Sequence, residues 1–225
     1  MNVLITGAGR GIGLGFVQHY LNQGANVWAC YRSDASLLQE IDNKNLNIVH
    51  WNVADNELSN DSEVFPPQLH LLINNAGIYG PKKQEGQSLD SITPESMLAV
   101  FGVNCVGAIT VVQHLKDRVV AAKGKIVNIS SKMGSIEENS SGGCYAYRAS
   151  KVALVMVSKS MAMDLAPYGV RVLALHPGWV RTDMTSHNGL ISVNESVSGM
   201  AGVIENIDQY TPGAFVAFDG QLIPY

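Results

Sequence analysis

Charged residues are scarce in this chain of 225 residues, and neither sign dominates. Lys and Arg number 15 and Asp and Glu number 19, which gives a formal net charge of −4. There is no basic stripe and no run of like charges, so the electrostatic signature of nucleic-acid-binding proteins is missing. We therefore expect no nucleic acid among the partners of this protein.

Cysteine is rare as well, and long apolar runs are missing. Cys30, Cys105 and Cys144 are far apart in the sequence and form no Cys-x-x-Cys pair. This argues against a disulfide framework or a bound metal and favours reduced thiols in a cytosol. The longest apolar run is well short of a membrane span, and the chain opens on a strand-like segment without the basic flank of a signal peptide. We predict a cytoplasmic protein that binds no membrane.

Apolar residues make up 46% of the chain and lie in short unbroken runs that alternate with helix-like stretches. Unbroken apolar strands are typical of a sheet covered on both faces, which favours parallel strands joined by helices. No repeat, low-complexity tract or linker divides the chain, so we predict one α/β domain over residues 1–225. The predicted strands cover residues 2–6, 26–31, 47–51, 69–74, 125–130, 170–175 and 214–218; the predicted helices cover 11–21, 35–41, 94–116, 147–165 and 194–204, and the polar residues 56–68 predict a loop.

Four glycines, Gly7, Gly9, Gly11 and Gly13, lie between the first predicted strand and the first predicted helix. Glycines at such a turn let the backbone approach a pyrophosphate, which the free N–H groups and the positive dipole end of the helix attract. A glycine turn could also bind nothing. Its place in the first strand–turn–helix unit favours a dinucleotide-binding site.

The residues after the second predicted strand indicate which dinucleotide is bound. An Asp or Glu at this strand end would bind the adenosine ribose hydroxyls of NAD, but Tyr31 occupies the place and Arg32 follows it. Arg10 lies inside the glycine loop. Two guanidinium groups near one ribose could hold a 2′-phosphate through forked, charge-assisted hydrogen bonds. We therefore predict NADP(H) in preference to NAD(H), the alternative being that both arginines are solvated surface charges.

A tyrosine and a lysine at helical spacing open the second long predicted helix. Tyr147 and Lys151 are four residues apart and share a helix face, so the ammonium could lower the pKa of the phenol and suit it to acid–base work. Ser131 closes the fifth predicted strand, where ligands of α/β sheets bind. Asn104 lies in an apolar helical stretch, where a buried amide needs a partner. Taken singly, each of these residues could equally be structural.

Together these motifs resemble the short-chain dehydrogenase/reductase family over essentially the whole chain, and they occur in the family's order. Several stretches resemble a narrower group, the carbonyl reductases of the sniffer and C-factor type. The family matches are the cofactor loop Thr6-Gly7-Ala8-Gly9-Arg10-Gly11-Ile12-Gly13, the segment Asn74-Asn75-Ala76-Gly77, the catalytic tetrad of Asn104, Ser131, Tyr147 and Lys151, and Pro177-Gly178 with Thr182. The narrower matches cover residues 130–135, 145–151 and 176–184.

The chain departs from the family pattern at two places. Asn52 stands where the family often has Asp near the adenine, and an amide can still form a hydrogen bond there. Ser131 and Tyr147 are further apart than usual. We expect the surplus, residues 137–144, to bulge as a loop that leaves both residues in place. Tyr145 is a rival for the tyrosine role, but only Tyr147 has a lysine four residues on.

The resemblance implies a Rossmann-like, doubly wound parallel sheet of about seven strands, with helices on both faces. It also implies that hydride passes between a nicotinamide and a carbonyl carbon. Tyr147 would act as general acid, Ser131 would hold the carbonyl oxygen, Lys151 would bind the nicotinamide ribose and lower the phenol pKa, and Asn104 would hold a water that relays protons to Lys151. The implied cofactor-binding residues are Gly7, Gly9, Arg10, Gly11, Ile12, Gly13, Arg32, Asn52, Val53, Asn75, Ala76, Gly77, Tyr147, Lys151, Pro177, Gly178, Val180 and Thr182.

The expected substrate is a small aldehyde, ketone or quinone, and the expected reaction is its NADPH-dependent reduction to an alcohol. Apolar residues near the expected site predict the pocket wall: Met133 and Trp179 above all, with Tyr79, Ile136 and residues 184–191. Two other functions remain open: a non-catalytic NADP-binding regulator or intercellular signalling protein, and an NAD-dependent alcohol dehydrogenase. The resemblance further implies a homodimer or homotetramer formed through the predicted helices 94–116 and 147–165.

Overall fold

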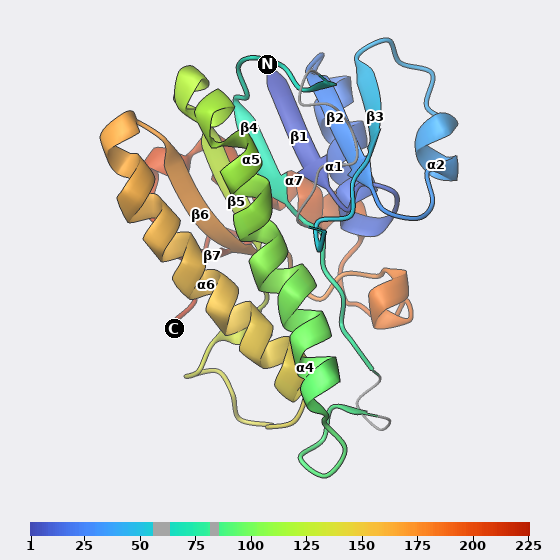
Figure 1. Cartoon of the computed structure of the whole chain (residues 1–225), viewed down its shortest axis with the longest axis vertical. Helices are drawn as coiled ribbons and strands as arrows, with labels where there is room; N and C mark the ends of the chain where they lie inside the picture. Colours follow the sequence, from blue (N-terminus) through green and yellow to red (C-terminus); the bar gives the residue numbers. More distant parts are fainter. Residues whose placement is uncertain (56–63, 82–85) are drawn as a thin grey trace.

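The computed structural model describes residues 1–55, 64–81 and 86–225. Within these ranges, seven parallel strands form a single sheet in the order β3-β2-β1-β4-β5-β6-β7 (Figure 1). The predicted fold class is therefore confirmed. The loop predicted at residues 56–68 lies partly outside the described residues. The strands are β1 (Asn2–Thr6), β2 (Asn26–Tyr31), β3 (Leu46–His50), β4 (Leu71–Asn74), β5 (Lys125–Ile129), β6 (Arg171–His176) and β7 (Phe215–Ala217).

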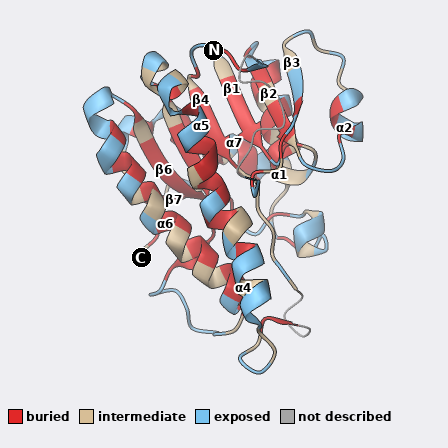
Figure 2. Cartoon of the chain, viewed as in Figure 1, coloured by how far each residue is buried: buried red, intermediate tan, exposed pale blue. Residues whose placement is uncertain are grey.

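Helices cover both faces of the sheet, as Figure 1 shows. One face carries α1 (Gly11–Asn22) and α7 (Val193–Glu205), and the other carries α4 (Pro94–Phe101), α5 (Gly107–Ala122) and α6 (Tyr145–Leu165). A separate apolar core lies on each side. Strands β1, β4, β5 and β6 are almost entirely buried, while the edge strand β3 is largely exposed (Figure 2). This double cover explains why the strands are unbroken apolar runs rather than alternating ones.

The chain order reverses between β1 and β4, which are neighbours in the sheet. Strands β1, β2 and β3 run outward on one side of this point, and β4 to β7 run outward on the other. In such sheets a crevice opens beyond the carboxyl ends of the strands at the switch point, and ligands bind there. The connections that leave β1, β4, β5 and β6 at this edge carry nearly all the predicted site residues.

The helix predicted at residues 94–116 is longer than expected and is not regular. It begins at Pro94, where Thr93 accepts a hydrogen bond from the Ser96 amide, and it continues to Ala122. The charged residues after Leu115 do not end it: Lys116 and Asp117 are exposed, and Arg118 is half-buried. Residues Gly102–Val106 form a π-helical turn between α4 and α5. By length and composition this segment is apolar enough to cross a membrane, but the inner face of α5 packs in the core against the sheet.

Smaller differences from the predicted boundaries have local causes. The predicted helix 35–41 is reduced to the single turn α2 (Ser36–Gln39). Helix α6 begins at Tyr145, two residues before the predicted start, and follows Cys144 in a left-handed conformation (φ 52°). It ends at Leu165, where Pro167 follows in a 3-10 turn and Gly169 (φ 77°) leads into β6. The predicted helix 147–165 therefore gains two residues at the end that carries Tyr147.

Candidate active site

The glycine loop takes a backbone path that side chains would block. Gly7 and Gly11 have φ values of 63° and 55°, in the left-handed region that favours glycine. A Cβ at Gly9 would lie 2.5 Å from the Asp34 carbonyl oxygen, and one at Gly13 would collide with the Gly7 carbonyl. Helix α1 follows without a side-chain cap and without an acidic residue in its first turn. Its free N–H groups therefore suit a pyrophosphate, as predicted.

The segment after β4 holds this loop in place. The Thr6 hydroxyl accepts hydrogen bonds from the amides of Asn75 and Ala76, both at 3.1 Å. The Asn75 side-chain amide donates to the carbonyls of Thr6 at 3.0 Å and Gly7 at 3.1 Å. The two motifs that the sequence suggested separately, residues 6–13 and 74–77, are thus joined at the switch point of the sheet.

Tyr147, Lys151 and Ser131 come together as predicted, and all three are buried. The Ser131 hydroxyl lies near the Tyr147 phenol and acts to lower its pKa. The Lys151 ammonium donates to the carbonyl of Ile129 at the end of β5, at 2.7 Å, and its Nζ lies 5.8 Å from the centroid of the Tyr147 ring. Residues 137–144 form a loop without helix or strand, so the surplus length is accommodated outside the site as expected.

Burial dominates the electrostatics of this group. It raises the pKa of the Tyr147 phenol to about 12, and the nearby Ser131 hydroxyl acts in the opposite direction. Burial lowers the pKa of the Lys151 ammonium to about 8, which a neighbouring Cys105 partly offsets. Lys151 is not among the causes of the shift in the phenol pKa, because its ammonium is directed to the Ile129 carbonyl and desolvation dominates. Its expected effect on the phenol in the cofactor-bound site stays a prediction. The phenol stays protonated at neutral pH.

Asn104 lies in the π-helical turn, with 1% of its surface exposed. Its Oδ1 accepts from the Ile78 amide at 2.8 Å, and its Nδ2 donates to the Ile78 carbonyl and to the Ser150 hydroxyl, both at 2.9 Å. The side chain thus joins the segment after β4 to α6. A Cβ at Gly77 would lie 3.3 Å from Asn104 Oδ1 and 3.5 Å from Lys151 Nζ. The expected water relay stays a prediction, and these two atoms face the space where it would run.

The segment after β6 closes over the glycine loop. Gly178 has a φ of 84°, and Val180 pairs with Ile191 in an isolated bridge. Thr182 and Thr185 form a capping box around a short 3-10 turn. A Cβ at Gly11 would lie 3.5 Å from Thr182 Cγ2. Thr182, one of the implied cofactor-binding residues, therefore lies next to the glycine loop that is predicted to hold the pyrophosphate.

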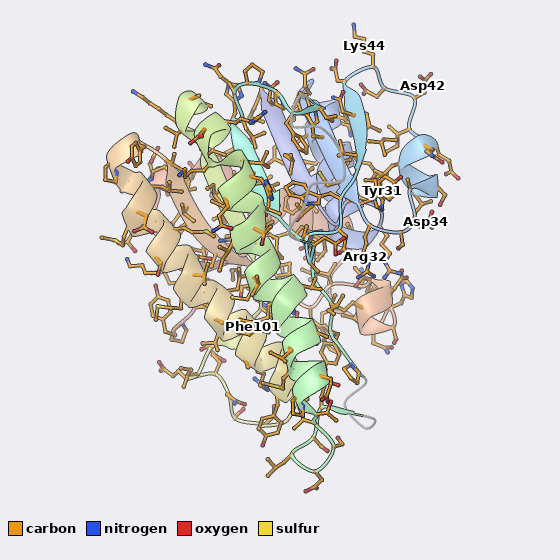
Figure 3. The ribbon with its side chains drawn as sticks, in the orientation of Figure 1. Tyr31, Arg32, Asp34, Asp42, Lys44 and Phe101 are labelled. Atoms are coloured by element: carbon orange, nitrogen blue, oxygen red, sulfur yellow. The ribbon has the colours of Figure 1, made fainter. Side chains whose placement is uncertain are left out.

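The two arginines predicted to select NADP lie at the carboxyl ends of β1 and β2. Arg10 forms an exposed ion pair with Asp183 at 3.2 Å. Figure 3 shows Arg32 and Asp34 beyond the end of β2, next to Tyr31. The Asp34 carboxylate accepts from the Ser36 amide at 2.9 Å, which together with the nearby Arg10 lowers its pKa. Asn52 donates to Asp55 at 3.0 Å, and Val53, beside it, is buried.

The predicted pocket wall is apolar and partly exposed. Met133 follows Ser131 in a 3-10 turn, and its amide donates to the Ser131 hydroxyl at 3.2 Å. Its carbonyl accepts from Arg148 at 3.2 Å. Among the other predicted wall residues, the large apolar side chains that reach the surface are Ile136, Trp179, Met184 and Leu190. An apolar rim of this kind suits a carbonyl compound with an apolar substituent.

Three contacts of the site had no clear sequence signal. The Tyr79 hydroxyl lies 2.9 Å from Cys144 Sγ. Gln87 is fully buried and contacts the first turn of α6. The Ser150 hydroxyl donates to the Tyr147 carbonyl at 2.8 Å. Only Ser150 could have been found, because a small polar residue three positions after Tyr147 shares its helix face.

A Rossmann-like sheet that carries a glycine loop and a buried Ser–Tyr–Lys group at its carboxyl edge defines a class of nucleotide-dependent oxidoreductases. The chain belongs to the short chain dehydrogenase family, whose model matches residues 1–190. It is similar to the C-signal of Myxococcus xanthus, with 35% identity over 156 residues, or 69% of this chain and 92% of the relative.

Two solved structures are similar along the whole chain. The NADPH-bound carbonyl reductase from chicken fatty liver has 34% identity and a TM-score of 0.89, with coverage of 100% of this chain and 98% of that one. The carbonyl reductase Sniffer of D. melanogaster has 30% identity and a TM-score of 0.92, with coverage of 100% and 99%. These likenesses support the predicted family and its sniffer and C-factor branch.

Proposed function

We propose that this protein reduces an aldehyde, ketone or quinone to an alcohol with NADPH. The observation that carries this proposal is the buried pair of Tyr147 and Ser131, which lie beside Lys151 at the carboxyl edge of the sheet. The NADPH-bound carbonyl reductase with 34% identity supports the choice of reaction and cofactor. The uncapped start of α1 and the glycine backbone of residues 7–13 fit a dinucleotide.

The chain's own residues would act as follows. Ser131 donates a hydrogen bond to the substrate carbonyl oxygen and holds it beside Tyr147. Tyr147 is the general acid: its phenol, protonated at neutral pH, gives its proton to that oxygen as negative charge develops there. Lys151, near its own pKa of about 8, binds ribose hydroxyls and returns a proton toward the phenol. NADPH, when bound, supplies the hydride.

The outer surface of α4 and α6 supports a proposed dimer or tetramer. Exposed apolar side chains gather there: Leu98, Phe101, Val106, Met156 and Met163. Figure 3 labels Phe101, the last residue of α4. Burial of such residues between two copies would remove apolar surface from water. We further propose a cytoplasmic location. NADPH would be available there, and the three free cysteines would stay reduced.

A second candidate is a signalling protein on the same scaffold, favoured by the 35% identity to the C-signal. The two candidates differ in what they require of Tyr147. A protein that only binds NADP or a receptor has no need of a protonated, buried phenol next to a lysine, so Tyr147→Phe would leave its binding unchanged. The third possibility, oxidation of alcohols with NAD, is distinguished by cofactor preference.

The test is the oxidation of NADPH and NADH over a panel of aldehydes, ketones and quinones, with Tyr147→Phe as the matched variant. This variant keeps the ring and removes only the proton donor. We expect turnover with NADPH and a loss of about 10²–10⁴-fold in kcat on the substitution. Tight NADPH binding without turnover would favour the signalling candidate. A preference for NADH would contradict the assigned roles of Arg10 and Arg32.

A further inference from the structure

The first turn of α6, which carries Tyr147, has no cap of its own. The residue before it, Cys144, is in a left-handed conformation and its side chain caps no helix amide. The first turn also contains no acidic residue. The first amides of a helix have no partner within the helix and must find one elsewhere. Because Tyr147 is buried, its amide cannot be left to solvent.

Gln87 supplies those partners from a distant segment. Its side-chain Oε1 accepts from the Tyr147 amide at 3.0 Å, and its backbone carbonyl accepts from the Tyr145 amide at 3.4 Å. Gln87 lies 60 residues before Tyr147 and has an exposed fraction of 0%. One residue therefore serves two of the orphan amides of the helix that carries the phenol.

The other half of the Gln87 amide fixes its orientation. Its Nε2 donates to the Tyr79 carbonyl at 2.7 Å and to the Pro81 carbonyl at 2.9 Å. A reversed amide would place N–H against N–H at Tyr147 and oxygen against two carbonyls, so the partners allow one orientation only. Gln87 thus connects α6 to the segment that continues from the cofactor motif 75–77.

That segment also contacts the phenol itself. The Tyr79 ring lies against the Tyr147 ring, with centroids 4.9 Å apart. A Cβ at Gly80 would lie 2.6 Å from Val100 and in ordinary contact, at 3.5 Å, with Gln87 Nε2, so glycine at this position leaves room for Val100 and places residues 79–81 next to the amide. Residues 79–81 therefore contact Tyr147 in two ways. Gln87 connects them to the Tyr147 backbone amide, and the Tyr79 ring packs directly on the Tyr147 ring.

We propose that Gln87 is a positioning residue, which holds Tyr147 in register with the cofactor segment by capping α6 from outside the helix. The proposal rests on the proposed reduction, because proton donation needs the phenol within a fraction of an ångström of its working place. Gln87 touches no reacting atom and is not catalytic. Its loss should therefore lower kcat without weakening the binding of NADPH.

The experiment compares Gln87→Met, Gln87→Glu and the control Ser158→Ala. Methionine matches the length of glutamine and removes all three side-chain hydrogen bonds. Ser158 is fully buried on the same helix, away from the site, where it donates to Leu154 and accepts from Asn128. Its alanine variant loses buried hydrogen bonds of α6 without touching Tyr147 and so reports on destabilisation alone.

We expect Gln87→Met to lower kcat about 10- to 100-fold with the Kd for NADPH unchanged. Gln87→Glu, which keeps an acceptor for the Tyr147 amide, should have a kcat between that of Gln87→Met and the wild type. Ser158→Ala should lower Tm with kcat unchanged. A kcat for Gln87→Met equal to that of the wild type would overturn the proposal, as would a fall in kcat matched by an equal weakening of NADPH binding.

Amide hydrogen exchange separates this proposal from the proposed function. Exchange in residues 145–150 should rise in Gln87→Met and not in Ser158→Ala, whether or not any carbonyl is turned over. Absence of turnover in the wild type with faster exchange in Gln87→Met would reject the reductase and keep the cap. Unchanged exchange would reject the cap. If Gln87→Met does not fold, Gln87→Glu, which loses only the two bonds from Nε2 to the Tyr79 and Pro81 carbonyls, should give a smaller rise in exchange and a smaller fall in kcat. No change in either would reject the cap.

Discussion

The ring of Tyr79 lies against the ring of Tyr147, with centroids 4.9 Å apart and planes inclined by 40°. Tyr79 belongs to the segment after β4 and Tyr147 to the first turn of α6, so the contact joins the cofactor side of the site to the proton donor. The Tyr79 hydroxyl is directed to Cys144 Sγ at 2.9 Å and not to the substrate side. The ring and the hydroxyl therefore have separate roles.

Substitutions of Tyr79 should separate those roles. Tyr79→Phe keeps the ring contact and loses a weak hydrogen bond to sulfur, so we expect a cost below about 1 kcal/mol and nearly unchanged kcat. Tyr79→Ala removes the ring and admits water beside the buried phenol, and we expect a loss of about 10-fold or more in kcat. Steady-state kinetics and urea unfolding of both variants check this. Equal kinetics of the two variants would show that the ring contact has no catalytic value.

Lys151 should make stability rise with pH in the alkaline range. Its pKa is about 8 in the folded protein, below the ordinary 10.5, because of burial. Between these two values the unfolded chain binds more protons than the folded chain, so the free energy of unfolding increases with pH. Lys151→Met removes this term. Urea unfolding from pH 7 to 10, at about one-unit steps, should show a flatter dependence for the variant. An identical slope in both proteins would show that Lys151 titrates normally.

His176 should make the protein sensitive to acid. Burial, reinforced by Lys132, lowers its pKa to about 4 from the ordinary 6.5. Its Nδ1 is buried without a hydrogen-bond partner in the described part of the chain. Between those two values the unfolded chain again binds more protons, so stability falls as the pH is lowered through this window.

Lys132→Gln provides the check on this acid sensitivity. It removes the cation that opposes protonation of His176, so the folded-state pKa should rise toward 6.5 and the acid loss should shrink. Asp219 acts in the opposite direction, and Asp219→Asn should enlarge the loss. Thermal unfolding of the three proteins between neutral and mildly acidic pH measures the order. Any other order would mean that these two charges do not control His176.

Arg10 and Arg32 should differ in their contributions to cofactor choice. The ion pair of Arg10 with Asp183 is exposed on both sides, and such pairs contribute only about 0–1 kcal/mol, so a 2′-phosphate can compete for the guanidinium. We expect Arg32→Ala to raise the KM for NADPH about 10-fold or more and to leave the KM for NADH unchanged. Arg10→Ala should show the same direction with a smaller effect. A parallel rise in both KM values would place these arginines away from the 2′-position.

The sequence was sufficient for the sheet, because its parallel strands are short apolar runs with glycine or proline at their ends. It was also sufficient to predict that Ser131, Tyr147 and Lys151 lie together and that the glycine loop leads into α1, since motif order and spacing carry over to the fold. The helix that contains Asn104 was harder to predict, because a π turn shifts the register and no residue type marks it. The pKa of Tyr147 was missed because it depends on how deeply the phenol is buried, which spacing does not reveal. Gln87 was missed because its partners lie 60 residues away.

The π turn at Gly102–Val106 places an extra residue in the helix that runs from Pro94 to Ala122. The side-chain directions of α5 are therefore rotated relative to those that a regular continuation of α4 would give. In a regular helix, a single period of about 3.6 residues per turn would set the direction of every side chain in both α4 and α5. Here the two halves meet at Asn104, which is fixed by Ile78 and Ser150. The exposed apolar surface of α4 and the buried face of α5 can therefore point in directions that one regular helix would not combine, with Asn104 held between them.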